Sequence, residues 1–246
     1  MIPADVPFGL YGGRIVRYRE RMSDYYKLYP TWGDLAREQV RRRGLPYFED
    51  VQKDIQNRLA KLLPSARTAF ALSCAERLMR AYERSPAIDQ SSLALSWRPI
   101  LDVMWLGLAG QQPLALQRVQ AALDEYRTSA EANDDSSDEH YDVDGEDAAA
   151  ASIYAAECYI AGEVQQACWA ASLAVDAAFR IAEDDLQLDP NAFAWDPDAE
   201  PMPLAQEAMH QAVQAELQRE QADLILLEQH DLSPNIFEQL KRSNSV

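Results

Sequence analysis

Apolar residues recur at every third or fourth position along most of this chain, which is the spacing that one face of an α-helix requires. Over residues 46–63 the apolar stripe consists of Phe48, Val51, Ile55, Leu59 and Leu62. Residues 65–83 are more strongly apolar and place on one face Phe70, Cys74, Leu78 and Tyr82. We find no convincing strand and no repeat of fixed period. The pattern therefore predicts an all-α protein.

Glycines and prolines divide this pattern into separate helices. The predicted helices cover residues 14–29, 30–44, 46–63, 65–83, 93–110, 112–130, 147–162, 163–185 and 204–229, with a short helical turn within 230–246. Gly44 and Gly110 are expected to end the helices in which they are the last residues. Gly162 separates two alanine-rich helices, and alanine lets helix surfaces approach closely. We therefore predict that these two helices form a tight antiparallel hairpin.

The chain has 246 residues, which is enough for one large domain. We predict a single bundle-like domain of about eight to ten helices. Its core is assigned to residues 61–232, with an acidic loop over 131–147. Residues 1–60 are predicted to form an N-terminal helical extension, and residues 233–246 a short C-terminal tail.

The composition favours an intracellular location. Hydrophobic residues make up 48% of the chain, so a sizeable core can form, yet no run of apolar residues is long enough for a transmembrane helix. The N-terminus lacks the basic and apolar regions of a secretory signal. The three cysteines, Cys74, Cys158 and Cys168, have no CxxC spacing and fall within helical patterns. We interpret them as reduced, buried thiols of a cytoplasmic protein.

The net charge of −17 is unevenly distributed. Residues 1–90 contain 16 Lys and Arg against 11 Asp and Glu, a net charge of +5, whereas residues 91–246 contain 7 against 29, a net charge of −22. The larger part would repel nucleic acid. It would attract a protein with a cationic surface.

No motif for catalysis or for a resident metal stands out. If Gly145 is aligned with the sixth position of an EF-hand loop, the first and last ligand positions fall on His140 and Ala151, which do not fit. His140, His210 and His230 lie far apart among polar neighbours and are predicted to be solvated. No phosphate-binding glycine motif and no nucleophile paired with a base occur. We therefore expect no metal, no cofactor and no enzymatic activity.

The acidic stretch that precedes the alanine run is the most unusual feature of the sequence. Its eight acids are Asp134, Asp135, Asp138, Glu139, Asp142, Asp144, Glu146 and Asp147. Glu146 and Asp147 stand directly before a predicted helix, whose dipole favours negative charge there, and Asp144 or Asp147 could cap it. Helix formation does not account for the earlier acids. Two interpretations stay open for them, a solvated linker and a recognition loop for a basic protein surface.

The alanine-rich segment also carries a resemblance. "DGEDAAAASIYAAECYIAGEVQQACWAASLAVDAAFRIAE" combines Asp147, the Gly162-Glu163 turn, an alanine-rich stretch around Trp169 and the late acid Asp176. "AFALSCAERLMRAYE", "WRPILDVMWLGLAG" and "AMHQAVQAELQREQADLILLE" fit the same pattern. Over roughly residues 60–230 the chain resembles the YjaG-like helical family and the related immunity proteins of bacterial polymorphic toxin systems. The first 60 residues have no counterpart in it.

This resemblance implies a bacterial immunity protein that binds and neutralises a cognate toxin by stoichiometric, non-catalytic inhibition. An acidic surface would suit a toxin whose active-site cleft is basic. We predict contacts from the acidic loop and from a second, proline-rich loop with Trp195, Asp196, Asp198 and Glu200. Trp195 could instead fold back onto the core.

Two alternatives to immunity are weighed. The chain could be a housekeeping helical scaffold or interaction protein with no toxin partner. It could also be an enzyme assisted by a metal that clustered carboxylates hold.

Overall fold

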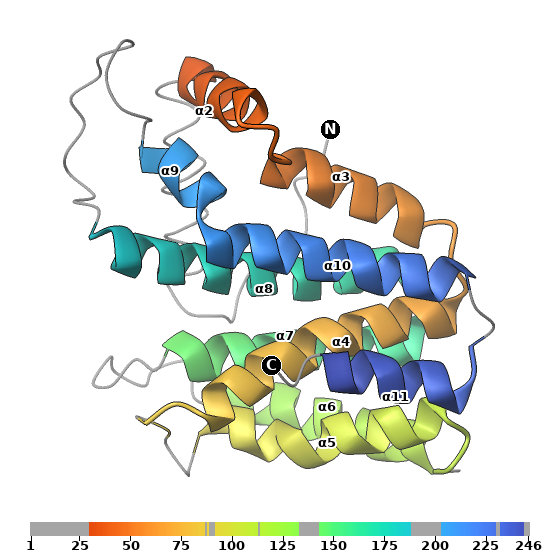
Figure 1. Ribbon diagram of the computed structural model, residues 1–246. Coiled ribbons are helices and arrows are strands. Elements are labelled where there is room, and N and C mark those ends of the chain that lie inside the picture. The colour runs from red at the N-terminus through yellow and green to blue at the C-terminus, as the bar shows by residue number, and fades with distance from the viewer. Residues whose placement is uncertain are drawn as a thin grey trace.

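The computed structural model describes residues 30–86, 88, 92–112, 114–132, 143–187, 203–229 and 232–243. Within these ranges ten helices pack together and no strand occurs, which confirms the all-α prediction (Figure 1). The helices are α2 (Pro30–Arg42), α3 (Phe48–Leu59), α4 (Pro64–Glu83), α5 (Leu93–Leu108), α6 (Ala115–Ala132), α7 (Val143–Ala161), α8 (Val164–Leu186), α9 (Pro203–Met209), α10 (Gln211–Gln229) and α11 (Pro234–Ser243). None of them combines the length and apolar character that crossing a lipid bilayer requires.

Helix α4 lies at the centre of the bundle. It packs against α5, α7, α8, α10 and α11, so 14 of its 20 residues are buried. In Figure 1, α8 and α10 lie on one side of α4, and α5 and α11 lie on the other. The sequence predicted one apolar face for this segment. The other faces of the helix are also covered, and Glu76 and Arg77 are therefore buried as well.

The local signals in the sequence are confirmed where the structure describes them. In α3, Val51, Ile55 and Leu59 are buried, as the predicted stripe requires. Gly44 and Gly110 follow α2 and α5 with a backbone angle φ of +71° each, in the left-handed region that glycine favours.

The predicted helix over 204–229 is wrong as a single element, because it is broken at His210 into α9 and α10. At the break, the side chain of Gln214 donates to the backbone oxygens of Ala208 (2.6 Å) and Pro46 (3.2 Å). The imidazole Nδ1 of His210 accepts from the backbone N–H of Ala212 at 3.3 Å. The break lets α9 pack against α2 while α10 continues along α8.

Both ends of the described chain contribute to the common core. From the region predicted as an N-terminal extension, α2 and α3 bury residues in the same hydrophobic cluster as the central helices. The predicted C-terminal tail contains a full helix, α11, which buries Phe237 and Leu240 and packs against α4 and α5. The predicted helix over 14–29 lies outside the described residues.

Candidate interaction surface

Helices α7 and α8 form the predicted antiparallel hairpin. Gly162 connects them with φ of +68°, and a Cβ atom at this position would lie 2.6 Å from the Cβ of Pro64. Alanines from both helices are buried in the interface, and the rings of Tyr154 and Trp169 lie 5.1 Å apart between them. Small side chains and a tight turn therefore fix the two helices side by side. The start of α7 is consequently placed beside the end of α8.

An ion pair ties these two helix ends together. Arg180 of α8 hydrogen-bonds Asp147 of α7 and lies 3.6 Å from Asp144. Helix α7 begins at Val143, so Asp144 and Asp147 lie within the helix and neither is its N-cap. Asp147 is only 1% exposed, and burial raises the pKa of its carboxyl group while Arg180 opposes that rise. The assignment of Asp147 to a contact loop is therefore corrected, because its side chain points into the bundle and is engaged by Arg180.

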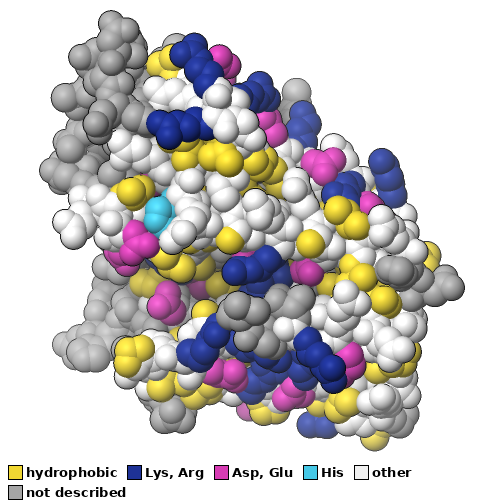
Figure 2. All heavy atoms as spheres, viewed as in Figure 1, with side chains coloured by type: hydrophobic (Ala, Val, Ile, Leu, Met, Phe, Trp, Pro, Cys, Tyr) yellow, Lys and Arg dark blue, Asp and Glu magenta, His cyan; other side chains and the backbone are white. Residues whose placement is uncertain are grey.

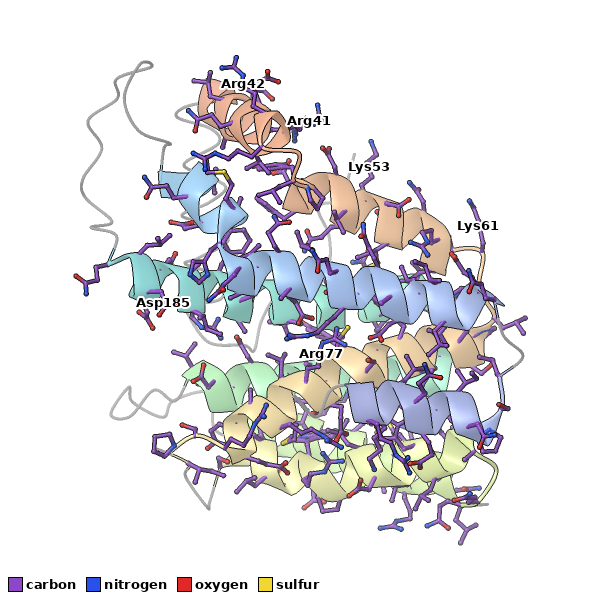
Figure 3. The ribbon with its side chains drawn as sticks, viewed as in Figure 1. Arg41, Arg42, Lys53, Lys61, Arg77 and Asp185 are labelled. Carbon is purple, nitrogen blue, oxygen red and sulfur yellow. The ribbon has the colours of Figure 1, made fainter. Side chains whose placement is uncertain are left out.

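Acidic side chains gather at this end of the bundle. We use the term acidic end for the exposed or half-buried acids Asp144, Glu146, Glu183, Asp184, Asp185 and Glu207. They come from the start of α7, the last turns of α8 and the short helix α9. Figure 3 shows Asp185 pointing outward there, and Figure 2 shows acidic side chains at the same edge of the molecule.

The acidic end has one strongly perturbed carboxyl group. Burial raises the pKa of Glu207 to about 8, and the negative charge of Glu183 adds to the rise. Beside this pair, Nε2 of His210 lies 3.4 Å from Asp185, and the His210 side chain is 13% exposed. His210 is therefore half-buried and hydrogen-bonded, which corrects the prediction of a solvated histidine. His140 and His230 lie outside the described ranges.

The two predicted contact segments join the bundle at this same end. Asp134, Asp135, Asp138, Glu139 and Asp142 lie outside the described residues, as do Trp195, Asp196, Asp198 and Glu200. The chain leaves the described structure after α8 and re-enters it at α9, and it enters α7 at Val143. These helix ends lie together at one side of the bundle (Figure 1). The structure thus brings the attachment points of two segments distant in sequence to one location, as the antiparallel α7–α8 hairpin requires.

A second polar cluster is enclosed inside the bundle. Arg77 of α4 donates to Glu216 at 2.8 Å and to Asp223 at 2.8 Å, both on α10. Arg77 is labelled in Figure 3. The hydroxyl of Ser73 donates to Asp223 at 2.5 Å. Among the described residues, neither carboxyl oxygen of Glu220, which is 0% exposed, has a hydrogen-bond partner, and burial together with the charge of Glu216 raises its pKa well above the ordinary value. Arg77, Glu216 and Asp223 are only 5–8% exposed, so we interpret this cluster as a structural element of the core.

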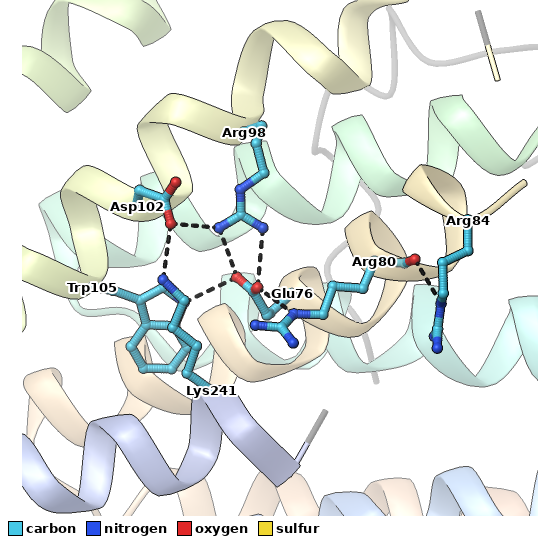
Figure 4. A network of polar contacts seen from close by, with 7 residues as sticks. All are labelled: Glu76, Arg80, Arg84, Arg98, Asp102, Trp105 and Lys241. Carbon is cyan, nitrogen blue, oxygen red and sulfur yellow. Dashed lines mark hydrogen bonds and ion pairs between the residues drawn. The ribbon is translucent and has the colours of Figure 1, made fainter. Parts of the chain in front are cut away.

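A third polar cluster opens to the surface (Figure 4). Glu76 of α4 is 1% exposed and accepts hydrogen bonds from Arg80, Arg98 and the indole of Trp105. Burial raises the pKa of Glu76, but the hydrogen bonds and charges of Arg98 and Arg80 outweigh it, so the pKa is lowered overall. Asp102 links Arg98 to Lys241 of α11, at 2.7 and 2.9 Å. No sequence pattern predicted this cluster, although four of its members, Glu76, Arg80, Arg98 and Asp102, form two pairs with the spacing i, i+4 on predicted helices.

The cysteines and the clustered acids offer no second site within the described residues. All three cysteines are free thiols, and burial raises the pKa of Cys158 to about 11 and that of Cys168 to about 12. Within the described ranges, no group of three or more His, Cys, Asp or Glu side chains is arranged to hold a metal ion. Comparison of the chain with family models, with curated proteins and with solved structures found no match. The acidic end is thus the surface with the clearest chemical character for binding a partner.

Proposed function

We propose that this protein binds a cationic surface of a bacterial toxin and neutralises the toxin without catalysis of its own. The observation that carries this proposal is the acidic end, together with the attachment there of both segments predicted to make contacts. The resemblance to immunity proteins supplies the type of partner. The free thiols favour the bacterial cytoplasm as the compartment in which the protein acts.

The arrangement of the acidic end suits electrostatic recognition. Its acids stand at the ends of helices that the α7–α8 hairpin holds rigidly, so a partner would meet a largely preformed pattern of charge. Arg180, the nearest described cation on the hairpin, is already engaged by Asp147 and Asp144. A field of one sign steers a partner of opposite sign and accelerates its association. Nucleic acid, which carries negative charge, would be repelled by the same surface.

The first experiment is capture of the partner. The full-length tagged protein is incubated with lysate of its native host, eluted with a salt gradient and analysed by mass spectrometry. One stoichiometric basic protein, or a multidomain protein with a basic C-terminal region, that elutes with increasing salt would support the proposal. Recovery of no such protein, although the neighbouring genes are expressed, would contradict it and favour the scaffold alternative.

The second experiment tests the acidic end itself with two variants of equal charge. The test variant neutralises three exposed acids of this end, as Asp144→Asn, Asp184→Asn and Asp185→Asn. The control variant neutralises three exposed acids elsewhere, as Asp124→Asn and Glu125→Gln on α6 and Glu238→Gln on α11. Both variants change the net charge by the same amount, so only the location of the change differs.

The rate of association with the captured partner distinguishes the two variants. At low salt, we expect the test variant to associate about tenfold more slowly and the control to stay close to the wild type. The difference should shrink as salt is added, because screening weakens long-range attraction. Equal rates for the two variants would remove the acidic end from the proposal, even if a partner had been captured.

A further inference from the structure

A group of basic side chains stands out against the acidic character of the chain. Four cations, Arg80, Arg84, Arg98 and Lys241, line one open pocket of about 450 Å³. The pocket lies where α4, α5 and α11 meet, and Figure 2 shows Lys and Arg side chains gathered over this region. Among the described residues, the carboxylates that line it are Glu76, Glu83 and Asp102. Cations therefore outnumber carboxylates in this pocket, the reverse of the whole chain.

The floor of the pocket is rigid, because a buried carboxylate organises it. The carboxylate of Glu76 accepts hydrogen bonds from both terminal nitrogens of Arg98, each at 3.0 Å, and from Nε of Arg80 at 2.6 Å (Figure 4). The indole N–H of Trp105 completes its hydrogen bonds at 3.3 Å. The negative charge of Glu76 is thus paired with arginines inside the protein. The arginines that it holds stay in fixed orientations at the pocket wall.

Hydrogen-bond donors remain available at the rim of the pocket. Arg84 is exposed, its Nε donates to the backbone oxygen of Arg80 at 3.1 Å, and it forms no ion pair with any described carboxylate. A guanidinium group has five N–H donors, so most of those of Arg84 are unused by the described residues. The ammonium group of Lys241 has three donors and gives one to Asp102. Charged donors of this kind bind phosphate and carboxylate oxygens strongly.

We propose that this pocket binds an oxyanion, a phosphate or carboxylate group, which Arg84 holds by hydrogen bonds at one end of the pocket while Arg80, Arg98 and Lys241 supply positive charge. The proposal is independent of the acidic end, which is built from α7, α8 and α9. The oxyanion can come from a free small molecule or from a carboxylate side chain of a bound protein. Glu83, exposed on the last turn of α4, opposes it by its negative charge.

Two neighbouring residues provide variants with opposite expected effects. Arg84→Gln removes the principal donor, whereas Glu83→Gln removes the repelling charge. Both side chains are exposed at the end of α4, so neither substitution disturbs the core. We expect Arg84→Gln to weaken oxyanion binding about tenfold, in line with the loss of a charged hydrogen bond. We expect Glu83→Gln to strengthen it about threefold, in line with exposed charge interactions.

Binding is measured by nuclear magnetic resonance and calorimetry on the full-length protein at low ionic strength. The probes are inorganic phosphate, citrate and a peptide with several internal glutamates, with chloride as the reference anion. The indole N–H signal of Trp105, assigned with Trp105→Phe, should shift on binding because this group lies against Glu76. The signal of Trp169, which packs between α7 and α8, should stay in place.

The outcomes separate the two sources of the oxyanion. Phosphate or citrate binding that Arg84→Gln weakens and Glu83→Gln strengthens supports a free small-molecule ligand. Binding of the acidic peptide alone, with the same dependence on the two variants, supports a carboxylate supplied by a protein. Equal affinities for every probe in the wild type and both variants, or no preference over chloride, would overturn the proposal.

Discussion

Replacing Glu220 should make the protein more stable and less sensitive to alkaline pH. Glu220 is 0% exposed, and neither of its carboxyl oxygens has a hydrogen-bond partner among the described residues. The guanidinium of Arg77, whose positive charge acts on Glu220, already donates to Glu216 and Asp223. If Glu220 were ionised, its negative charge would have no positive charge left to pair with, because Arg77 is already engaged by two other carboxylates. Burial therefore raises the pKa of Glu220 well above the ordinary value, and the group is held in its neutral form.

The direction of the pH dependence follows from the raised pKa. Above its ordinary pKa the unfolded chain releases the Glu220 proton, whereas the folded protein keeps it. The free energy of unfolding therefore falls as pH rises, by about 1.4 kcal/mol per pH unit, until the pH reaches the folded pKa. Glu220→Gln removes it, because the amide does not titrate.

Urea unfolding followed by circular dichroism at pH 5, 6, 7 and 8 measures this effect. The stabilisation of Glu220→Gln relative to the wild type should grow with pH, and Glu220→Leu should add to it by removing the unpaired polar atoms. Glu228→Gln is the control, since Arg58 lowers the pKa of Glu228 and its effect should not vary over this pH range. A Glu220→Gln variant that is less stable than the wild type at pH 8, or equally stabilised at every pH, would refute the reasoning.

Two further predictions concern the core. Arg77→Met leaves its two carboxylate partners buried without a cation, so the free energy of unfolding at pH 7 should fall by about 3–5 kcal/mol; urea unfolding measures this, and a loss below 1 kcal/mol would mean that the buried pairs contribute little. Gly162→Ala places a Cβ 2.6 Å from the Cβ of Pro64 at a positive φ, whereas Gly110→Ala meets nothing within 4 Å. Gly162→Ala should therefore lower the melting temperature by more than Gly110→Ala, and equal shifts would show that backbone strain alone decides the cost.

The sequence located most of the helices, but it did not determine which faces of each helix other helices bury. Hydrophobic periodicity placed α3, α4, α5 and α8 within a few residues of their observed bounds, and Gly162 marked the hairpin turn correctly. These features depend on neighbouring residues only. The break at His210 was missed, because the hydrogen bond that favours it joins Gln214 to Pro46, which is distant in the sequence.

The acidic end shows the same division. The sequence revealed the excess of acids, since composition and charge are properties of the chain itself. It could not show that Asp147 turns inward to Arg180, or that α9 packs against α8. Its predicted contact residues beyond Asp144, Glu146 and Asp147 lie outside the described residues. Which acids face a partner depends on how the helices pack.

The sequence by itself determined that the chain is helical, where most helices begin and end, and that its charge is strongly negative. The tertiary structure decided which charged side chains are buried and which are clustered at the surface. Glu76 and Arg77 stand next to each other on α4, yet one organises a pocket at the surface and the other holds a buried cluster against α10. Their partners lie up to 146 residues further along the chain, in helices that a local pattern cannot place. Long-range packing sets the solvent access and the neighbours of a charged group, and these determine what that group does.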